Sequence, residues 1–328
     1  MAKVYGLAMS LRGGIDLGGT KIEAIVVDDG QEVRGASRRE TPHEGGPPDV
    51  VQELAATLRE ACEAASVEPT ELAGVGVGSP GEVDTAAGTV SRASNLPDWS
   101  GSFPVADTLT KELGVRVAVA NDVRVAVEAE RQLGAGRTYR SFLGAWWGTG
   151  IGGGVVLDGR LWRGRGSAGE LGHMVVRLGG ARCPCGRRGC IEAYAGRAAM
   201  EARARRAVEK GAKTDLFELM KKRNRDRLTS GVWADALERK DELAERLIHR
   251  AVAALGAGIA SVINLLDLEG VVVGGGLGTR FGQPAAERIA EAMRPHLFVS
   301  DRPPAVVTSE LGDAGGALGA ALLVSEPG

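Results

Sequence analysis

A strand, a turn rich in glycine and threonine, and a returning strand occur twice in this chain, about half a chain apart. The first copy runs through residues 14–30, and the second runs through residues 141–157 with its turn over Gly148–Gly154. In both copies a strand follows the glycines, so the first is no Walker loop and the second is no dinucleotide-binding turn. The repeat predicts duplication of one α/β unit with a ligand between the copies; two unrelated glycine hairpins are the alternative.

Length and composition indicate a globular protein of about two domains, because domains hold roughly 100–200 residues each. The chain has 328 residues, of which 44% are hydrophobic and 25% are charged. Glycine is unusually frequent, with 49 residues, which favours tight turns and backbone close to a ligand. The net charge of −2 argues against nucleic acid as a partner, since phosphate binding needs a basic surplus.

No apolar run approaches the roughly 18 residues of a membrane span, so we expect no membrane partner. The stretch Met1–Leu11 lacks a cleavage pattern, so we expect no secretory signal. Three of the four cysteines lie within eight positions, which favours a metal site over a disulfide framework and hence the reducing cytoplasm.

The hydrophobic patterns predict alternating strands and helices. No low-complexity linker separates the two halves of the chain, so we expect a hinge between them. We expect a loop over residues 79–84, and Gly134 as the C-cap of a helix that starts at Asn121-Asp122 and runs to about Leu133. Besides this helix, we expect helices over residues 48–66, 197–266 with a solvated break near 221–229, and 314–324. After the first hairpin, we expect strands over residues 72–78, 115–120, 141–147, 155–157 and 271–273.

Phosphate chemistry is indicated at the first turn, where small residues leave backbone N–H groups open to an anion. The residues concerned are Asp16, Gly18, Gly19, Thr20 and Lys21, and Asp16 is a candidate ligand for Mg²⁺. Asn121-Asp122 ends an apolar strand and starts a helix, which suits either a plain N-cap or a general base at the ligand edge of a sheet.

The most specific pattern is His173 followed by Cys183, Cys185 and Cys190. One imidazole and three thiolates suit tetrahedral zinc, and Gly186 and Gly189 permit the sharp loop between the thiols. Three unrelated buried or redox-active thiols are the alternative, and Cys62 is expected in the core.

Two carboxylates flank this pattern, Glu170 and Glu192. They are either ordinary surface charges or, because the metal would join both segments, partners for the hydroxyls of a sugar.

Together these residues resemble the ROK family (repressor, open reading frame, kinase) and its bacterial glucokinase-like sugar kinases. The resemblance covers nearly the whole chain. It is carried by Ile15-Asp16-Leu17-Gly18-Gly19-Thr20-Lys21, Gly78-Ser79-Pro80-Gly81, Asn95-Leu96-Pro97-Asp98-Trp99, Asn121-Asp122, Gly148-Thr149-Gly150-Ile151-Gly152-Gly153-Gly154, Glu170-Leu171-Gly172-His173, the cysteine loop with Glu192, and Val273-Gly274-Gly275-Gly276.

The resemblance implies an actin-like (ribonuclease H-like) fold of two α/β domains with an interdomain cleft. The first domain would span 1–121, with a C-terminal helix of about 313–328 returning to it, and the second, 122–312, would carry the zinc loop. ATP with Mg²⁺ would lie between the two turns; besides the first turn, its residues would be Gly148, Thr149, Gly150, Gly152, Gly274, Gly275 and Gly276.

The resemblance further implies that Asp122 takes the proton from the 6-hydroxyl of a hexose. The other hydroxyls would be held by Gly81, Asn95, Asn121, Glu170, His173 and Glu192. His173 would bind structural zinc through one ring nitrogen and the sugar through the other. Homodimers or homotetramers are also implied.

The sequence departs from the family pattern at two places. Val123-Arg124-Val125-Ala126 stands where the family usually has Ala-Asn-Ala-Ala, and Arg124 is a candidate to alter the cleft entrance or pair with a phosphate. Trp146-Trp147 replaces small or β-branched residues; either Trp147 narrows the nucleotide site or both rings pack in the sheet.

We therefore expect an ATP-dependent kinase that phosphorylates glucose at the 6-hydroxyl. Mannose, fructose or an N-acetylhexosamine are alternative sugars, and polyphosphate is an alternative donor, with Arg163, Arg165, Arg187 and Arg188 as cationic candidates. A sugar-responsive repressor is disfavoured, because only 13 residues precede the first motif at Gly14 and leave no room for a winged helix.

Overall fold

The computed structural model describes residues 10–93 and 95–324. They form two compact units: the described residues up to Ala129 together with those from Ala314 onward, and Glu130–Asp313. The division falls inside helix α3 (Asp122–Leu133). The predicted boundary at 121/122 stays a prediction, and residues 1–9 and 325–328, on which the expectations for the chain ends partly fall, lie outside the described residues.

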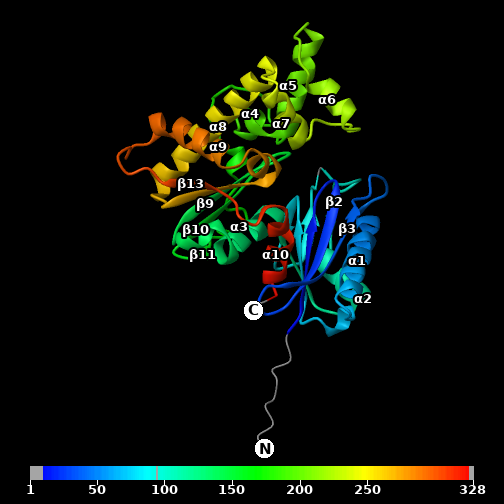
Figure 1. Ribbon diagram of the computed structural model, residues 1–328. Coiled ribbons are helices and arrows are strands. Elements are labelled where there is room, and N and C mark those ends of the chain that lie inside the picture. Colours follow the sequence, from blue (N-terminus) through cyan, green and yellow to red (C-terminus); the bar gives the residue numbers. More distant parts are fainter. Residues whose placement is uncertain (1–9, 94, 325–328) are drawn as a thin grey trace, which may run out of the picture. The chain divides into compact units, whose positions relative to one another are not determined.

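The first unit is built on a five-stranded sheet in the order β3-β2-β1-β4-β8 (Figure 1). Its strands are β1 (Arg12–Leu17), β2 (Lys21–Val27), β3 (Val33–Glu40), β4 (Val75–Ser79) and β8 (Val117–Asn121). β1 and β2 are antiparallel, which confirms the predicted hairpin, whereas β1, β4 and β8 run parallel. Asp16 therefore pairs with Gly78 while Ser79 pairs with Asn121, so the carboxyl ends of three strands meet at one edge.

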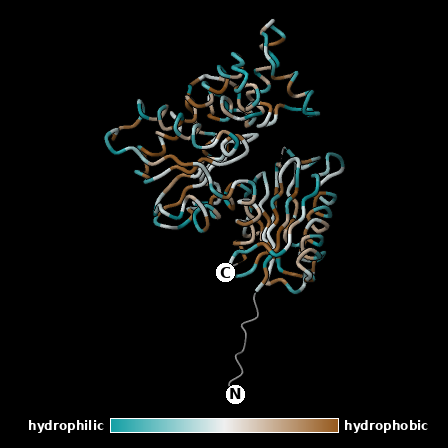
Figure 2. Tube along the Cα trace, viewed as in Figure 1, coloured by the Kyte–Doolittle hydropathy of each residue, from teal (hydrophilic) through white to brown (hydrophobic). Residues whose placement is uncertain are grey.

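Helices cover both faces of this sheet, and the apolar strands lie between them (Figure 2). α1 (Pro47–Ala64) and α2 (Val105–Leu113) bury Leu54, Leu58 and Leu109 against one face. The C-terminal helix α10 (Gly315–Leu322) packs on the other face through β1 and β4.

A second, three-stranded sheet occupies the region where we expected a loop over 79–84. It consists of β5 (Glu82–Asp84), β6 (Thr89–Ser91) and β7 (Ser102–Phe103). The loop prediction was wrong for Glu82–Asp84, which form a hairpin with β6, whereas Pro80 and Gly81 belong to no strand. β7 pairs with β6, and the buried Trp99 donates its indole N–H to the Val90 carbonyl at 3.1 Å.

The second unit repeats the topology of the first, with the strand order β11-β10-β9-β12-β13. Its strands are β9 (Phe142–Trp147), β10 (Ile151–Leu157), β11 (Arg160–Leu161), β12 (Gly270–Gly274) and β13 (Ala305–Thr308). In both sheets the first three strands are antiparallel and the first, fourth and fifth are parallel, as duplication of one α/β unit predicts. The second turn is shorter than predicted, because Gly152–Gly154 pair with β9 as part of β10.

The helical block is broken more often than expected. The helices of the second unit are α4 (Glu192–Ala195), α5 (Arg197–Glu209), α6 (Leu216–Lys222), α7 (Ser230–Glu238), α8 (Glu242–Leu266) and α9 (Gly275–Met293). Gly211 in the left-handed conformation follows α5, and the side chains of Thr229 and Asp241 cap the starts of α7 and α8. Helix α9 was not predicted, and it contains Pro284 and non-helical backbone at Gly282.

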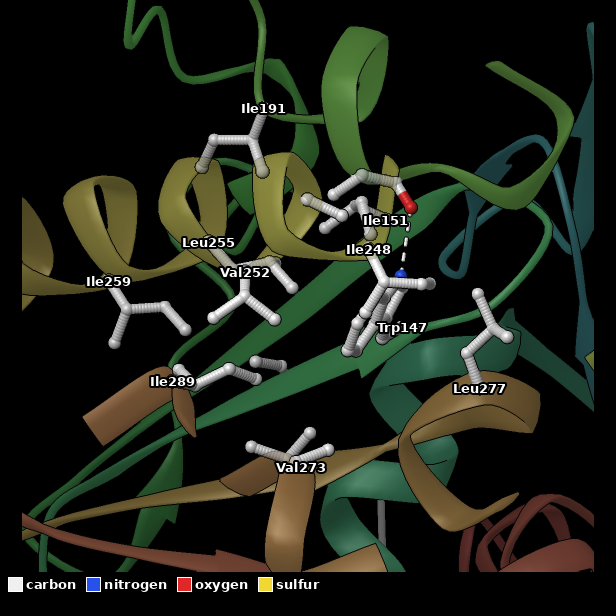
Figure 3. Close-up of a cluster of buried hydrophobic side chains, with 14 of the residues drawn as sticks. Trp147, Ile151, Ile191, Ile248, Val252, Leu255, Ile259, Val273, Leu277 and Ile289 are labelled. Carbon is white, nitrogen blue, oxygen red and sulfur yellow. Dashed lines mark hydrogen bonds between the residues drawn. The ribbon is translucent and has the colours of Figure 1, made fainter. Parts of the chain in front are cut away.

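The long helix α8 belongs to the core of the second unit. Ile248, Val252, Leu255 and Ile259 on α8 face Val273 and Ile289 (Figure 3). By length and hydropathy α8 is the one membrane-span candidate among the described residues. The expectation that no apolar run approaches the length of a membrane span was therefore wrong. Since 67% of its most apolar window is buried inside the protein, it is accounted for as a core helix.

Gly134 does not form the expected left-handed cap, because its φ is −120°. A Cβ at Gly134 would lie 2.1 Å from the Glu130 carboxylate, which accepts hydrogen bonds from the amides of Ala135 and Leu311. Glycine is therefore needed here to make room for Glu130, a buried acid that ties together two distant segments of the second unit.

Close approach of α10 to the first sheet depends on glycine. A Cβ at Gly76 would lie 1.7 Å from the Ala320 carbonyl oxygen, and one at Gly14 would lie 2.1 Å from the Ala317 carbonyl oxygen. We predict that Gly76→Ala lowers the free energy of unfolding by about 3 kcal/mol, because overpacking would lift α10 from the sheet.

Gly101→Ala is the matched control, since a Cβ there meets nothing within 4 Å and should change stability by at most about 0.5 kcal/mol. Chemical denaturation measures both variants. Equal stability of the two would contradict this account of the α10 contact.

Candidate functional site

The first glycine turn joins β1 to β2 and is closed by a hydrogen bond of 2.9 Å from the Gly18 amide to the Lys21 carbonyl. The buried hydroxyl of Thr41 donates to the Gly18 carbonyl at 2.6 Å, and the Thr41 amide donates to the Thr20 carbonyl. Lys21 forms an ion pair with Glu23 at 3.0 Å, so a phosphate at this turn would compete with that carboxylate. Thr41 carries no signal in the sequence and was missed.

Asp16 and Asp122 lie on either side of a small glycine at the carboxyl edge of the first sheet. A Cβ at Gly78 would meet the Cα of Asp122 at 3.5 Å and Oδ1 of Asp16 at 3.8 Å. The Asp16 carboxylate also lies against the start of α10, since a Cβ at Gly316 would approach it to 2.5 Å. The partly positive helix start favours a carboxylate there.

Asn121 does cap α3, as the plainer interpretation predicted. Its Oδ1 accepts hydrogen bonds from the amides of Val123 (3.1 Å) and Arg124 (3.2 Å). Asp122 Oδ1 accepts from the Val123 amide at 2.8 Å. The carboxylate of Asp122 is thus oriented at the first turn of a helix, next to the strand ends that also carry Asp16.

Gly81 and Asn95 are held in the first unit by contacts that need glycine. Gly81 has a φ of +89°, and a Cβ there would lie 2.7 Å from the Ser91 carbonyl oxygen. Asn95 lies directly on the first turn, because a Cβ at Gly19 would meet the Asn95 carbonyl oxygen at 2.9 Å. An expected sugar-binding residue therefore contacts an expected nucleotide-binding turn.

The four predicted metal ligands converge in the second unit. The ligand atoms of His173, Cys183, Cys185 and Cys190 all lie within 4.8 Å of one another. Sγ of Cys185 and Cys190 are 3.8 Å apart, and Sγ of Cys183 lies 3.8 Å from Nδ1 of His173. Bonds of about 2.3 Å in a tetrahedron place two sulfurs about 3.7 Å apart, so this donor set fits a tetrahedral metal ion.

The loop that carries the thiols folds as the sequence predicted. Gly186 and Gly189 both have a φ of +87°, and the Cys183 amide donates to the Arg187 carbonyl at 2.9 Å. Burial raises the pKa of the Cys183 thiol to about 12, so a metal ion must displace its proton on binding. Cys62 is buried in the core of the first unit, as expected, and burial raises its pKa to about 11.

Glycine contacts fix the segment 169–173 on β10. A Cβ at Gly172 would lie 2.1 Å from the Ile151 carbonyl oxygen, and one at Gly153 would lie 2.6 Å from the Gly169 carbonyl oxygen. This contact places the half-buried His173 with Nδ1 toward the thiols, which leaves Nε2 for another partner. Glu170 is on the same segment and is exposed.

Glu192 links the candidate metal ligands to the second glycine turn. Its Oε2 accepts a hydrogen bond of 2.9 Å from the Ile151 amide, and the Cys183 thiol donates to its Oε1 over 3.9 Å. A Cβ at Gly150 would lie 2.3 Å from the same carboxylate. Glu192 is thus a positioned acid and not an ordinary surface charge.

The second turn is held by the start of α5. The Gly148 amide donates to the Gly150 carbonyl at 3.0 Å, and Nη2 of Arg197 donates to the Thr149 hydroxyl at 2.6 Å. Arg197 was missed, and its only signal is its place after Gly196 at the start of a helical pattern.

The glycine triplet Gly274–Gly276 ends β12 and starts α9 beside this turn. A Cβ at Gly148 would lie 4.0 Å from the Gly276 amide nitrogen, so the two backbones approach each other in the second unit. Open amides at the start of a helix suit an anion. Gly276 itself faces open space.

Trp147 does not narrow this region, so that expectation was wrong. Its side chain is buried and donates its indole N–H to the Ala195 carbonyl at 2.8 Å (Figure 3). The ring also packs edge-on to Phe281. Side chains alternate along a strand, so the neighbouring Trp146 points to the opposite face, where its ring covers Gly274. For Arg124 the structure adds the hydrogen bond from its backbone amide to Asn121 Oδ1 at 3.2 Å.

The chain is similar to known sugar kinases over nearly its whole length. The family model described as "ROK family" matches residues 12–327. A glucokinase of Thermotoga maritima is 35% identical over 318 residues, which cover 95% of this chain and 96% of that protein. N-acetylgalactosamine kinase AgaK of Shewanella is 34% identical over 319 residues, which cover 94% of this chain and 95% of that protein. A Streptomyces griseus ROK family glucokinase, solved with glucose and AMPPNP, superposes with a TM-score of 0.81 at 30% identity, covering 96% of this chain and 99% of that one.

Proposed function

Since the chain belongs to the ROK family, we propose that it is an ATP-dependent hexose kinase that phosphorylates glucose at the 6-hydroxyl. Its two α/β units have the actin-like fold of the ROK sugar kinases, as the resemblance implied. The observation that carries the proposal is the arrangement around Cys183, whose Sγ lies 3.8 Å from His173 Nδ1 and 3.9 Å from Glu192 Oε1. The candidate metal ligands thus hold the imidazole, and the Ile151 amide holds the Glu192 carboxylate beside them at 2.9 Å; both groups are of the kind that binds sugar hydroxyls.

The metal is proposed to be structural zinc, held by His173, Cys183, Cys185 and Cys190. Zinc bound at Nδ1 would fix the ring direction and tautomer of His173, so that Nε2 is presented to the sugar. Four protein ligands leave no open position, which makes the zinc a scaffold and not a Lewis acid on the phosphoryl group. Mg²⁺ bound with ATP would instead supply the positive charge that neutralises the transferred phosphoryl group.

The remaining sugar hydroxyls are assigned to Gly81, Asn95, Asn121, Glu170 and Glu192. Support differs among them: Glu192 and Asn95 contact glycine turns, Gly81 is fixed by its backbone, and the carbonyl oxygen of the Asn121 side chain is occupied in the cap of α3. Asn121 would therefore use its amide nitrogen. Glu170 rests on its place beside His173.

Asp122 is assigned as the base that accepts the proton of the attacking hydroxyl. The Val123 amide orients its carboxylate, and Asp16 beside it is the candidate to hold Mg²⁺ with ATP. The phosphates are assigned to Gly18, Gly19, Thr20 and Lys21 and to Gly148, Thr149, Gly150, Gly152 and Gly274–Gly276. Because the transition state is loose, positioning of the hydroxyl in line with the phosphorus contributes more than proton removal.

Another sugar or donor remains the second candidate. The identity to AgaK, 34%, is close to that with the glucokinase, 35%, so an N-acetylhexosamine is as well supported by overall similarity as glucose. For polyphosphate the support is four exposed arginines: Arg163, Arg165, Arg187 and Arg188. The homodimer or homotetramer and the cytoplasmic location stay predictions.

A coupled assay tests the function directly. Glucose, mannose, fructose and the N-acetylhexosamines are each supplied with ATP–Mg²⁺ and, in parallel, with polyphosphate. We expect the highest kcat/KM with glucose and ATP. A higher value with another sugar or with polyphosphate would reassign the substrate, and no product with any hexose would refute the kinase proposal.

Replacement of Asp122 by Asn tests the proposed base. We expect kcat to fall by about 10²–10⁴-fold, the usual contribution of a general base. The fold should persist, because the amide oxygen of Asn can still accept from Val123. Asp107→Asn, on the exposed side of α2, is the charge-matched control. A kcat for Asp122→Asn within about tenfold of the control would remove Asp122 from this role.

Metal analysis tests the zinc site. Freshly purified protein should contain about one zinc per chain, and less than about half an equivalent would contradict a four-ligand site. Cys185→Ser should lose zinc, since it removes a ligand from an exposed position. Cys62→Ala removes a cysteine from the core of the first unit and should retain the full zinc content.

A further inference from the structure

The start of α5 orients the amides of the second glycine turn. The Arg197 amide donates to the Gly148 carbonyl and the Ala198 amide donates to the Thr149 carbonyl, both at 3.1 Å. In a trans peptide the carbonyl and the following N–H point in opposite directions. These two bonds therefore direct the N–H groups of Thr149 and Gly150 away from α5. Within the described part of the chain, neither of these two amides has a hydrogen-bond partner.

The Arg197 side chain orients a third donor. Nη2 donates to the Thr149 hydroxyl at 2.6 Å, and Nη1 donates to the Leu228 carbonyl at 3.0 Å. A hydroxyl oxygen that accepts from a guanidinium keeps its own proton for another acceptor. The same loop is fixed from the other side, because the Leu228 amide donates to Oε2 of Glu201 at 2.8 Å. The fork of Arg197 is thus anchored and holds Thr149 as a donor.

We infer that Arg197 is a positioning residue for the phosphate donor: its side chain aims the Thr149 hydroxyl at the phosphate oxygens, beside the two amides that the start of α5 orients. Three converging donors form an anion cradle, and the guanidinium adds a positive charge behind it. Arg197 retains that charge although burial lowers its pKa, because arginine stays protonated in proteins. The inference rests on the proposed kinase function and assigns Arg197 to donor binding and not to the sugar.

Four variants test this role: Arg197→Met, Arg197→Lys, Thr149→Ala and the double variant Arg197→Met/Thr149→Ala. We expect Arg197→Met to raise the KM for ATP about tenfold, as expected for one charge-assisted hydrogen bond, while the KM for glucose changes less than about twofold. Lys cannot hold both acceptors in one fork, so Arg197→Lys should recover only part of the loss. Because Arg197 acts through the Thr149 hydroxyl, the KM for ATP of the double variant should lie within about twofold of that of Thr149→Ala.

Arg206→Met is the matched control, since Arg206 lies on the same helix, is exposed and takes no part in the described contacts that hold Thr149 or the Leu228 loop. A KM for ATP in Arg197→Met within about twofold of this control would overturn the inference. The inference would also be overturned if the double variant raised the KM for ATP by the product of the two single-variant factors. Thermal unfolding shows whether each variant is folded, and Arg197→Lys carries the test if Arg197→Met is not.

A binding arm separates this inference from the function. The Kd for AMPPNP, measured by calorimetry, needs no turnover and should rise about tenfold in Arg197→Met. Wild-type protein that binds AMPPNP but phosphorylates no hexose would refute the kinase and leave the Arg197 assignment standing. Wild-type protein that does not bind AMPPNP would refute both.

Discussion

Direct contact between backbones is the constraint on which the described sites of this protein depend. Gly172 packs directly on the Ile151 carbonyl oxygen, and Gly19 packs directly on the Asn95 carbonyl oxygen, because neither glycine has a Cβ. Such contacts hold the two segments, and the side chains that they carry, close together. The same contact docks α10 on the first sheet at Gly14 and Gly76. An added methyl group would move backbone atoms and not merely a flexible side chain, so the glycine content reflects geometry in folded layers and not flexibility.

The repeated topology explains why the reactive groups lie where they do. In each unit a hairpin is followed by two parallel strands, and the carboxyl ends of the first, fourth and fifth strands share one edge. Asp16 and Asp122 lie at that edge in the first unit, and the second glycine turn and Gly274–Gly276 lie at the equivalent edge in the second. Parallel strands in α/β sheets place ligands there because helix starts and open amides collect at that end.

Local patterns in the sequence were sufficient where the chemistry depends on near neighbours. The two hairpins, the left-handed backbone at Gly186 and Gly189 and the convergence of the three thiols with His173 follow from turn chemistry and metal-ligand spacing. Predictions failed where packing or strand pairing decides the outcome, even between near neighbours. Gly134 makes room for the Glu130 carboxylate, which the Leu311 amide holds, Gly152–Gly154 extend the hairpin with β9, and Glu82–Asp84 form a hairpin with β6.

The sequence by itself determined the duplicated α/β plan, the candidate metal ligands and the candidate acids, because each is encoded in local patterns of residue types. Only the tertiary structure decided that Trp147 is a core residue while Trp146 covers Gly274, that Glu192 reaches the Ile151 amide, and that Arg197 holds Thr149. These contacts join residues from about 40 to about 130 positions apart. Sequence spacing carries no information on them, since they exist only once the sheet, the metal loop and α5 have packed together.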